Sequence, residues 1–141
     1  MSTEQNKSIV RRWVENGWNK GNLALVDELY TPDYTLHDAQ ATAPVNSAAA
    51  FKQYVMSYRT AMPDLHFAID DLVAEGDKVA WRFTARGTQT GPLGTLPPTG
   101  KKAVVTGTVT SRFTGGKWCE DYINLDVLGM MQQLGVIPMM A

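Results

Sequence analysis

The sequence has few of the features that would place a protein outside the cytoplasm or on a nucleic acid. It contains a single cysteine and two histidines, and its 13 basic residues nearly balance its 14 acidic ones. One cysteine excludes an intrachain disulfide framework and a cysteine-rich metal site. The net charge of −1 gives no electrostatic reason to expect a nucleic acid or an anionic membrane as partner. Because the sequence shows no signal-peptide-like segment and no long apolar run, we expect a cytoplasmic protein.

The common catalytic and cofactor-binding motifs are also missing. The sequence contains no P-loop, no dinucleotide fingerprint, no nucleophile elbow and no His-Cys spacing of a metal site. Cys119 has no evident activating partner, so a thiolate nucleophile is not expected. With 141 residues, of which 44% are hydrophobic, the chain is long enough for one domain with a real core, and we assign residues 1–141 to it.

Three amphipathic helices are predicted in the first half of the chain. Apolar residues recur at helical spacing over residues 3–20, where Ser2 and Gln5 have the spacing of a capping box. Asn22 is expected to cap a second helix that ends with Tyr30, and Ser47 a third that runs to Met62. A short extended piece over residues 33–38 separates the last two helices.

Alternating patterns follow and predict a four-stranded meander. The predicted strands are residues 65–74, 78–87, 102–113 and 117–125, with a short helix at 127–134 capped by Asp126. Helices followed by strands indicate an α+β fold, in which the three N-terminal helices cover the concave face of a curved, mostly antiparallel sheet. The apolar strand face expected beneath them comprises Phe67, Ile69, Trp81, Phe83, Val109 and Ile123.

The last strand carries an acidic residue on an apolar face. With strict alternation, Cys119, Asp121, Ile123 and Leu125 share one face, and Trp118 lies on the other. A buried carboxylate is unfavourable unless it is paired or has a chemical role. Asp121 is therefore expected to line a pocket, or to form an ion pair with Arg82 or Arg112, or to lie at a solvated strand end.

Several short motifs, in their order along the chain, resemble the SnoaL-like polyketide cyclase family. They are Arg11-Arg12-Trp13, Trp18-Asn19-Lys20-Gly21-Asn22, Pro63-Asp64, Glu75-Gly76-Asp77-Lys78, Gly87-Thr88, Pro97-Pro98-Thr99-Gly100-Lys101, Gly116-Lys117 and Gln133-Leu134-Gly135. The resemblance implies an NTF-type, cystatin-like α+β barrel with an internal apolar cavity. It further implies that the cavity binds an aromatic polyketide or another small apolar molecule, with no metal and no organic cofactor.

The chain departs from the cyclases of this family at the residues that perform the reaction. The resemblance places the catalytic aspartate of the cyclases at Ile123 and their histidine at Val109, and neither side chain here can transfer a proton. The family often has histidine where this chain has Asp121. These departures favour the branch of the family thought to hydroxylate anthracycline-type polyketides.

Two residues are candidates for catalysis. Burial would raise the pKa of Asp121 and suit it to accept a phenolic or enolic proton. His37 is expected near the mouth of the cavity, where an imidazole could shuttle a proton, or it is a loop histidine bonded to the backbone. Tyr54, Trp18 and Trp81 are candidates for substrate contact, with core packing as the alternative. The apolar residues Phe83, Val109 and Ile123 complete the expected substrate-binding set.

These residues lead to one preferred function and two alternatives. The preferred function is cofactor-independent hydroxylation of a bound polycyclic polyketide, for which a separate reductase could supply the reduced substrate. The alternatives are aldol cyclisation with Asp121 as the base, and a protein that only binds a small apolar ligand. The strand face with Thr106, Thr108, Thr110 and Arg112 is suited to packing on a second sheet, so we expect a homodimer.

Overall fold

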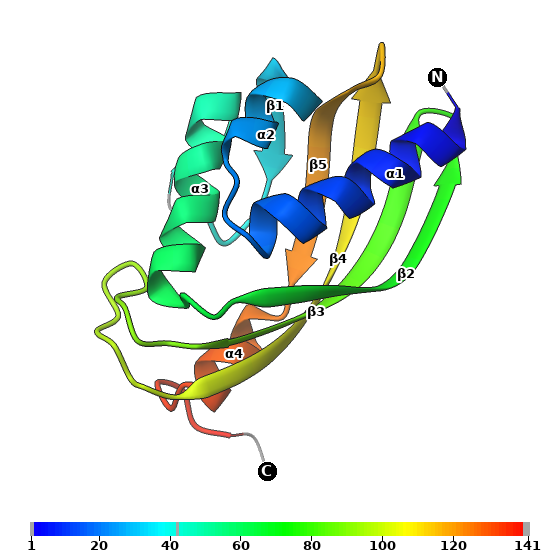
Figure 1. Cartoon of the computed structure of the whole chain (residues 1–141). Helices are drawn as coiled ribbons and strands as arrows, with labels where there is room; N and C mark the ends of the chain where they lie inside the picture. The colour runs from blue at the N-terminus through cyan, green and yellow to red at the C-terminus, as the bar shows by residue number, and fades with distance from the viewer. Residues whose placement is uncertain (1, 42, 140–141) are drawn as a thin grey trace.

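A five-stranded sheet with the strand order β1-β5-β4-β3-β2 organises the chain (Figure 1). The computed structural model describes residues 2–41 and 43–139. The strands are β1 (Tyr30–His37), β2 (His66–Glu75), β3 (Lys78–Thr88), β4 (Lys102–Thr114) and β5 (Lys117–Leu125). Strands β2 to β5 form the predicted antiparallel meander, and β1 joins it in parallel with β5.

The N-terminal helices lie against the concave side of this sheet (Figure 1). They are α1 (Thr3–Trp13), the π-helical turn η1 (Val14–Trp18), α2 (Ala24–Leu29) and α3 (Ala48–Ala61). A short helix, α4 (Val127–Gln133), follows the last strand. The predicted α+β architecture, with N-terminal helices covering a mostly antiparallel sheet, is confirmed.

Most of the predicted helix starts are confirmed by their caps. The hydroxyl of Ser2 accepts a hydrogen bond from the backbone N–H of Gln5, whose side chain accepts one in return from the Ser2 backbone. The side chains of Ser47 and Asp126 cap α3 and α4 by accepting from the backbone N–H groups of Ala50 and Gly129. The Asn22 cap is wrong, because α2 begins at Ala24 without a side-chain cap.

The first helix is not a single α-helix over residues 3–20. It changes to a π-helical turn after Trp13, and such turns insert a residue and rotate the side chains that follow. Gly17 lies against the indole of Trp13, so the absence of a side chain there permits the close approach. The turn directs Trp18 into the core, where its ring stacks on Phe67 with the centroids 4.6 Å apart.

Strand alternation correctly predicts the two faces of β3 and β4. In β4 the inward side chains are small or apolar, and Thr106, Thr108 and Thr110 face outward and are exposed. In β3, Trp81 and Phe83 face inward and Arg82 outward. The concave face therefore forms the core together with the helices.

Alternation fails in β5 because of a β-bulge near its start. Gly115 and Gly116 both have positive φ angles (55° and 80°), as a two-residue hairpin turn requires. The pairing then shifts between Phe113↔Trp118 and Arg112↔Glu120, so that one extra residue stands in β5. The extra residue returns Trp118 to the concave face, where it is fully buried. The prediction that Trp118 lies opposite Asp121 is wrong for this reason.

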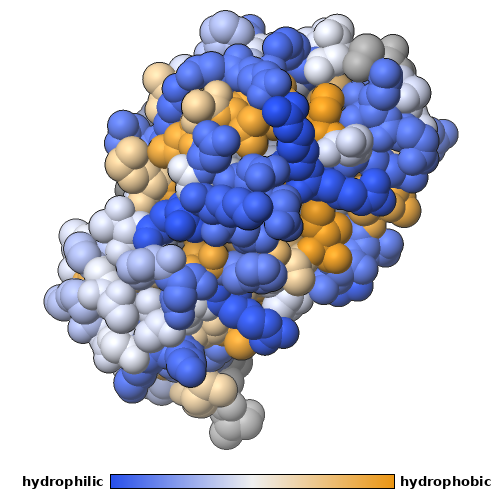
Figure 2. Space-filling view, in the orientation of Figure 1, coloured by the Kyte–Doolittle hydropathy of each residue, from blue (hydrophilic) through white to orange (hydrophobic). Residues whose placement is uncertain are grey.

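The outer surface of the helices is largely polar. In the orientation of Figure 1, hydrophilic residues cover most of the visible face, and hydrophobic surface appears in separate patches between them (Figure 2). Within residues 2–41 and 43–139, no helix has the length and apolar composition needed to cross a membrane.

The close contact between Gly17 and Trp13 predicts a specific loss of stability. In Gly17→Ala, the new methyl group would overlap the Trp13 indole, which is 1% exposed and has no room to move. We expect the free energy of unfolding, measured with denaturant, to fall by about 1–3 kcal/mol. Ser8→Ala, at an exposed position of α1, is the control and should change it by less than about 0.5 kcal/mol. Equal stability of the two variants would contradict the packing described for η1.

Candidate active site

Two adjoining apolar pockets lie between the helices and the concave face of the sheet. The space that a water-sized molecule could occupy is small, about 30 Å³ in the inner pocket and about 40 Å³ in the outer one. The inner pocket is lined by Trp13, Trp18, Tyr30, Leu36, Phe51, Tyr54, Phe67, Trp81, Phe83, Val109, Trp118, Asp121 and Ile123. Asp121 is the charged residue in this otherwise aromatic and aliphatic wall.

The outer pocket continues toward the ends of the strands. It shares Trp18, Tyr54, Phe67, Phe83 and Ile123 with the inner pocket, so these side chains form the boundary between the two. Its remaining wall comes from the end of α3, from β3 and β4, and from α4. Because the free space in both pockets is small, a flat polycyclic ligand could reach Asp121 from the strand ends only if the shared side chains move apart.

All six residues predicted to contact a substrate line these pockets. Trp18, Tyr54, Phe83 and Ile123 line both, and Trp81 and Val109 line the inner one. That these residues bind a substrate stays a prediction.

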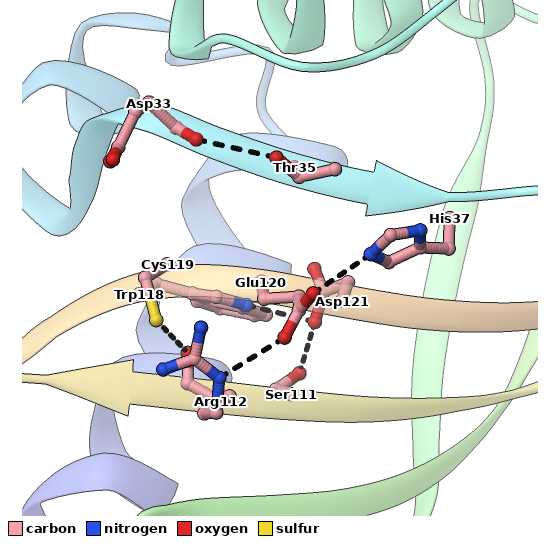
Figure 3. Close-up of polar contacts among 9 residues, drawn as sticks. All are labelled: Asp33, Thr35, His37, Ser111, Arg112, Trp118, Cys119, Glu120 and Asp121. Atoms are coloured by element: carbon pink, nitrogen blue, oxygen red, sulfur yellow. Dashed lines mark hydrogen bonds and ion pairs between the residues drawn. The ribbon is translucent and has the colours of Figure 1, made fainter.

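Asp121 is held by three hydrogen-bond donors. Its Oδ1 accepts from the Ser111 hydroxyl at 2.5 Å and from the indole N–H of Trp118 at 2.8 Å, and its Oδ2 accepts from the Tyr34 hydroxyl at 2.5 Å. The indole of Trp81 donates in turn to Ser111. Figure 3 shows Ser111 and Trp118 converging on Asp121 from β4 and β5. Ser111 is held by the indole of Trp81, and the rings of Tyr34 and Trp118 both pack against Tyr30. The three donors are therefore fixed, and so is the orientation of the carboxyl group.

Burial dominates the acidity of this carboxyl group. Asp121 is 4% exposed, and its desolvation raises the pKa to about 7, although the hydrogen bonds from Ser111, Tyr34 and Trp118 oppose the rise. The ion pairs considered from the sequence are wrong, since Arg82 pairs with Asp70 and Arg112 with Glu120. The solvated strand end is wrong too. Asp121 is therefore a buried group that can change protonation near neutral pH.

The two carboxyl oxygens of Asp121 differ in how many further hydrogen bonds they can accept. Oδ1 already accepts two hydrogen bonds, whereas Oδ2 accepts one, from Tyr34. A carboxylate oxygen can accept about two. Because Asp121 lines the inner pocket, Oδ2 is the atom best able to take a proton from a molecule bound there.

His37 does not lie at the mouth of the cavity. It occupies the outward-facing side of β1, where its Nε2 is 2.8 Å from an oxygen of Glu120 and its ring stacks on Tyr122. Glu120 also accepts a hydrogen bond from Arg112 at 3.0 Å (Figure 3). The predicted position is wrong because Leu36 points into the core, and alternation along β1 then turns His37 to the outer face of the sheet.

Tyr54 contributes its ring to the pocket and uses its hydroxyl elsewhere. The hydroxyl donates to the carboxylate of Asp38 at 2.9 Å. Burial, followed by the nearby Tyr58 and Asp38, raises the Tyr54 pKa far above its ordinary value. Tyr54 is thus a neutral aromatic wall residue and not a proton donor in this structure.

Sequence reasoning missed the residues that hold Asp121. Tyr34 lies in the short extended piece, and its role depends on the parallel pairing of β1 with β5, which no local pattern reveals. The sequence could have indicated Ser111, because it is a polar residue on the otherwise apolar inward face of β4. Counting residues outward from the Gly115-Gly116 turn would have paired it with Glu120, and the bulge shifts the true partner to Asp121.

A metal centre has no evident place in the described part of the chain. Among residues 2–41 and 43–139, no group of three or more His, Cys, Asp or Glu side chains is arranged to hold a metal ion.

Comparison with known families gives a match over most of the chain. The profile of the SnoaL-like polyketide cyclase family covers residues 8–134. No protein of the curated set matches the chain.

Solved structures with the same architecture include cyclase and hydroxylase candidates. A polyketide cyclase candidate from Acidithiobacillus ferrooxidans is 29% identical, with a TM-score of 0.84 over 96% of this chain and 98% of that one. IdmH, a polyketide cyclase candidate from Streptomyces antibioticus, is also 29% identical, with a TM-score of 0.77 over 92% and 97%. AclR, a hydroxylase candidate from Streptomyces galilaeus, is 24% identical, with a TM-score of 0.85 over 99% and 87%, and supports the fold alone.

The raised pKa of Asp121 predicts a pH-dependent contribution to stability. The unfolded chain releases this proton near the ordinary pKa of 3.8, and the folded protein retains it until about pH 7. Between these values the folded state binds more protons, so its stability falls as the pH rises. We expect the free energy of unfolding of the wild type, relative to that of Asp121→Asn, to decrease by about 3 kcal/mol between pH 4 and pH 7.

The measurement is denaturant unfolding of both proteins at several pH values. Asp71→Asn removes an exposed carboxyl group of β2 and controls for the loss of one charge. If the stabilities of wild type and Asp121→Asn changed in parallel with pH, the carboxyl group would titrate alike in both states and its burial would have no effect on its pKa.

Proposed function

The chain belongs to the SnoaL-like polyketide cyclase family, and from this membership and the site around Asp121 we propose that it catalyses an intramolecular aldol cyclisation of an aromatic polyketide. The observation that carries the proposal is the buried Asp121 carboxyl group in the wall of an apolar pocket, with a pKa raised to about 7. A general base is most effective when its pKa is near the working pH.

Asp121 would supply the proton transfer that Ile123 and Val109 cannot. As a carboxylate, its Oδ2 takes a proton from the carbon between two carbonyl groups of the substrate. The resulting enolate carbon attacks a ketone in the same molecule and forms the new carbon–carbon bond. The alkoxide that results takes the proton back from Asp121, so the enzyme returns to its starting state without a co-reactant.

The pocket supplies the selectivity for an aromatic substrate. Its walls are built from indole, phenol and phenyl rings, with Trp18 and Phe83 at the boundary of both pockets. Such surfaces bind flat apolar molecules by stacking and by exclusion of water. Confinement in the pocket also holds the reactive chain of the substrate close to the base.

Hydroxylation is the second candidate, and the apolar character of Ile123 and Val109 favours it. In that reaction Asp121 would help to deprotonate a hydroquinone form of the substrate, which passes electrons to dioxygen. One oxygen atom enters the product and the other leaves as water, with electrons from the hydroquinone and from the hydroxylated C–H bond. A separate reductase would supply the hydroquinone from the quinone form of the substrate. Sequence reasoning placed this reaction first. Asp121 could serve either reaction, and we propose cyclisation first because it needs no co-reactant.

The base role of Asp121 predicts a large loss of turnover in Asp121→Asn. We expect kcat to fall by about 10²–10⁴-fold, and kcat/KM of the wild type to rise with pH and level off above about pH 7. The measurement is the rate of ring closure of an uncyclised anthraquinone ester under nitrogen and in air. Asp71→Asn is the matched control and should retain the wild-type rate.

The possible results of this experiment distinguish a cyclase, a hydroxylase and a protein that only binds the ester. Ring closure at the same rate without oxygen supports the cyclase. Oxygen uptake and a product heavier by one oxygen atom, obtained with a chemically reduced substrate, would replace it by the hydroxylase. Full activity of Asp121→Asn would exclude the base role in either reaction. Tight binding of the ester without turnover would leave a binding protein.

We also propose that the protein is a homodimer that pairs through the outer face of its sheet. The N-terminal helices cover the opposite face, and on the outer face Val104 is 44% exposed beside the row Thr106, Thr108 and Thr110. Sheets can pack on each other through such faces. Sedimentation at micromolar concentration should give the mass of two chains, and a monomer alone would contradict the proposal.

A further inference from the structure

We propose that the hydroxyl group of Tyr30 binds the substrate carbonyl oxygen that becomes negatively charged when Asp121 removes the neighbouring proton. The proposal rests on the acid–base function proposed for Asp121 and adds a second functional group at the same end of the pocket. It also defines the ligand class as an aromatic ketone with an acidic C–H group next to its carbonyl.

The first observation is that the Tyr30 hydroxyl is buried without a partner. The residue is 3% exposed, and no protein atom of the described residues forms a hydrogen bond with its hydroxyl oxygen. Asn6 and Thr31 also have a buried side-chain oxygen of this kind, but of the three residues Tyr30 alone lines the inner pocket. A buried hydroxyl without a partner is unfavourable by about 1–3 kcal/mol, so its retention needs an explanation.

The second observation is that the ring of Tyr30 is fixed by aromatic neighbours. It stacks on Trp118 with the centroids 4.7 Å apart and the planes 13° from parallel. The edges of Trp13 and Tyr34 meet it at 80° and 87°, and Phe51 packs at 5.0 Å. Because the ring is held on several sides, the hydroxyl cannot turn toward another protein group. A preorganised donor of this kind is what an oxyanion site requires.

The third observation is the relation between Tyr30 and Asp121. Trp118 joins them, because one face of its ring stacks on Tyr30 while its indole N–H donates to Asp121. Both residues line the inner pocket. Burial, and then the nearby charge of Asp121, raises the pKa of Tyr30 well above its ordinary value, so the phenol remains protonated and able to donate.

The two tyrosines that lie nearest to Tyr30 and Asp121 at the inner pocket are already engaged. The hydroxyl of Tyr34 donates to Asp121, and that of Tyr54 to Asp38. Tyr30 is thus the tyrosine of this group with a donor left for a ligand. As the proton moves from carbon to Asp121, negative charge develops on the carbonyl oxygen, and the O–H group of Tyr30 would stabilise it there.

The test uses Tyr30→Phe, which keeps the ring and its stacking and removes the hydroxyl alone. The probe is 1-tetralone, an aromatic ketone that has no second carbonyl and cannot cyclise. We expect Tyr30→Phe to bind it about tenfold more weakly than the wild type by calorimetry, the loss of one hydrogen bond. The infrared carbonyl band of the bound probe should lie at higher wavenumber in the variant, where no hydrogen bond weakens the C=O bond.

Stability and turnover separate a functional from a structural role. Tyr30→Phe should be at least as stable as the wild type, because the hydroxyl has no partner among the described residues, whereas kcat for the cyclisation should fall about 10²-fold with a smaller change in KM. Tyr122→Phe, which removes an outward-facing hydroxyl from a residue that is 53% exposed, is the control for the loss of a tyrosine hydroxyl.

Three results would overturn the proposal. They are unchanged affinity and an unchanged carbonyl band in Tyr30→Phe, a lower stability of this variant with unchanged binding, and failure of the wild type to bind the ketone. If instead binding depends on Tyr30 and no polyketide is cyclised, Tyr30 is established as a ligand donor and the proposed cyclase function fails. The two proposals are therefore tested separately.

Discussion

The burial of one carboxyl group is the constraint on which the rest of the site depends. A carboxylate in an apolar wall is stable only if its oxygens are hydrogen-bonded or if it takes up a proton. Asp121 does both, since three donors hold it while desolvation keeps its pKa near 7. The fold supplies those donors from three neighbouring strands, β1, β4 and β5. The same hydrogen bonds that make burial tolerable also fix the direction of the group, which is what a catalytic base needs.

Local irregularities of the backbone bring these partners together. The bulge in β5 turns Trp118 inward, next to Asp121, and the π-helical turn after α1 brings Trp18 to the pocket. In β1 the pairing with β5 is interrupted between Tyr30 and Thr35, a segment that contains Pro32, which cannot donate to a sheet. Each irregularity places an aromatic ring in or beside the pocket. The regularly paired strands position Asp121 and Ser111, and the irregular segments add the aromatic rings around them.

This division explains how much the sequence could predict. Periodicity and capping residues predicted the α+β class, the four strands of the meander, a short extended piece that overlaps β1, and the inward direction of Trp81, Phe83 and Asp121, because these depend on local patterns. The location of His37 and the face of Trp118 were wrong, because strand pairing and a bulge determine them. Tyr30 was assigned to the end of a helix, and its position at the start of β1 appears only when β5 is in place. The donors to Asp121 come from distant parts of the chain, so no single stretch of sequence contains the site.

The central claim is that Asp121 is a buried acid–base group that titrates near neutral pH, and carbon NMR tests it most directly. Labelling the aspartate side chains and assigning the Asp121 carboxyl signal with Asp121→Asn allows its titration to be followed in the folded protein. The account predicts a midpoint near pH 7. A midpoint near the ordinary value of 3.8 would show that the hydrogen bonds outweigh the burial, and Asp121 would then be a structural carboxylate and too weak a base for the proposed reaction.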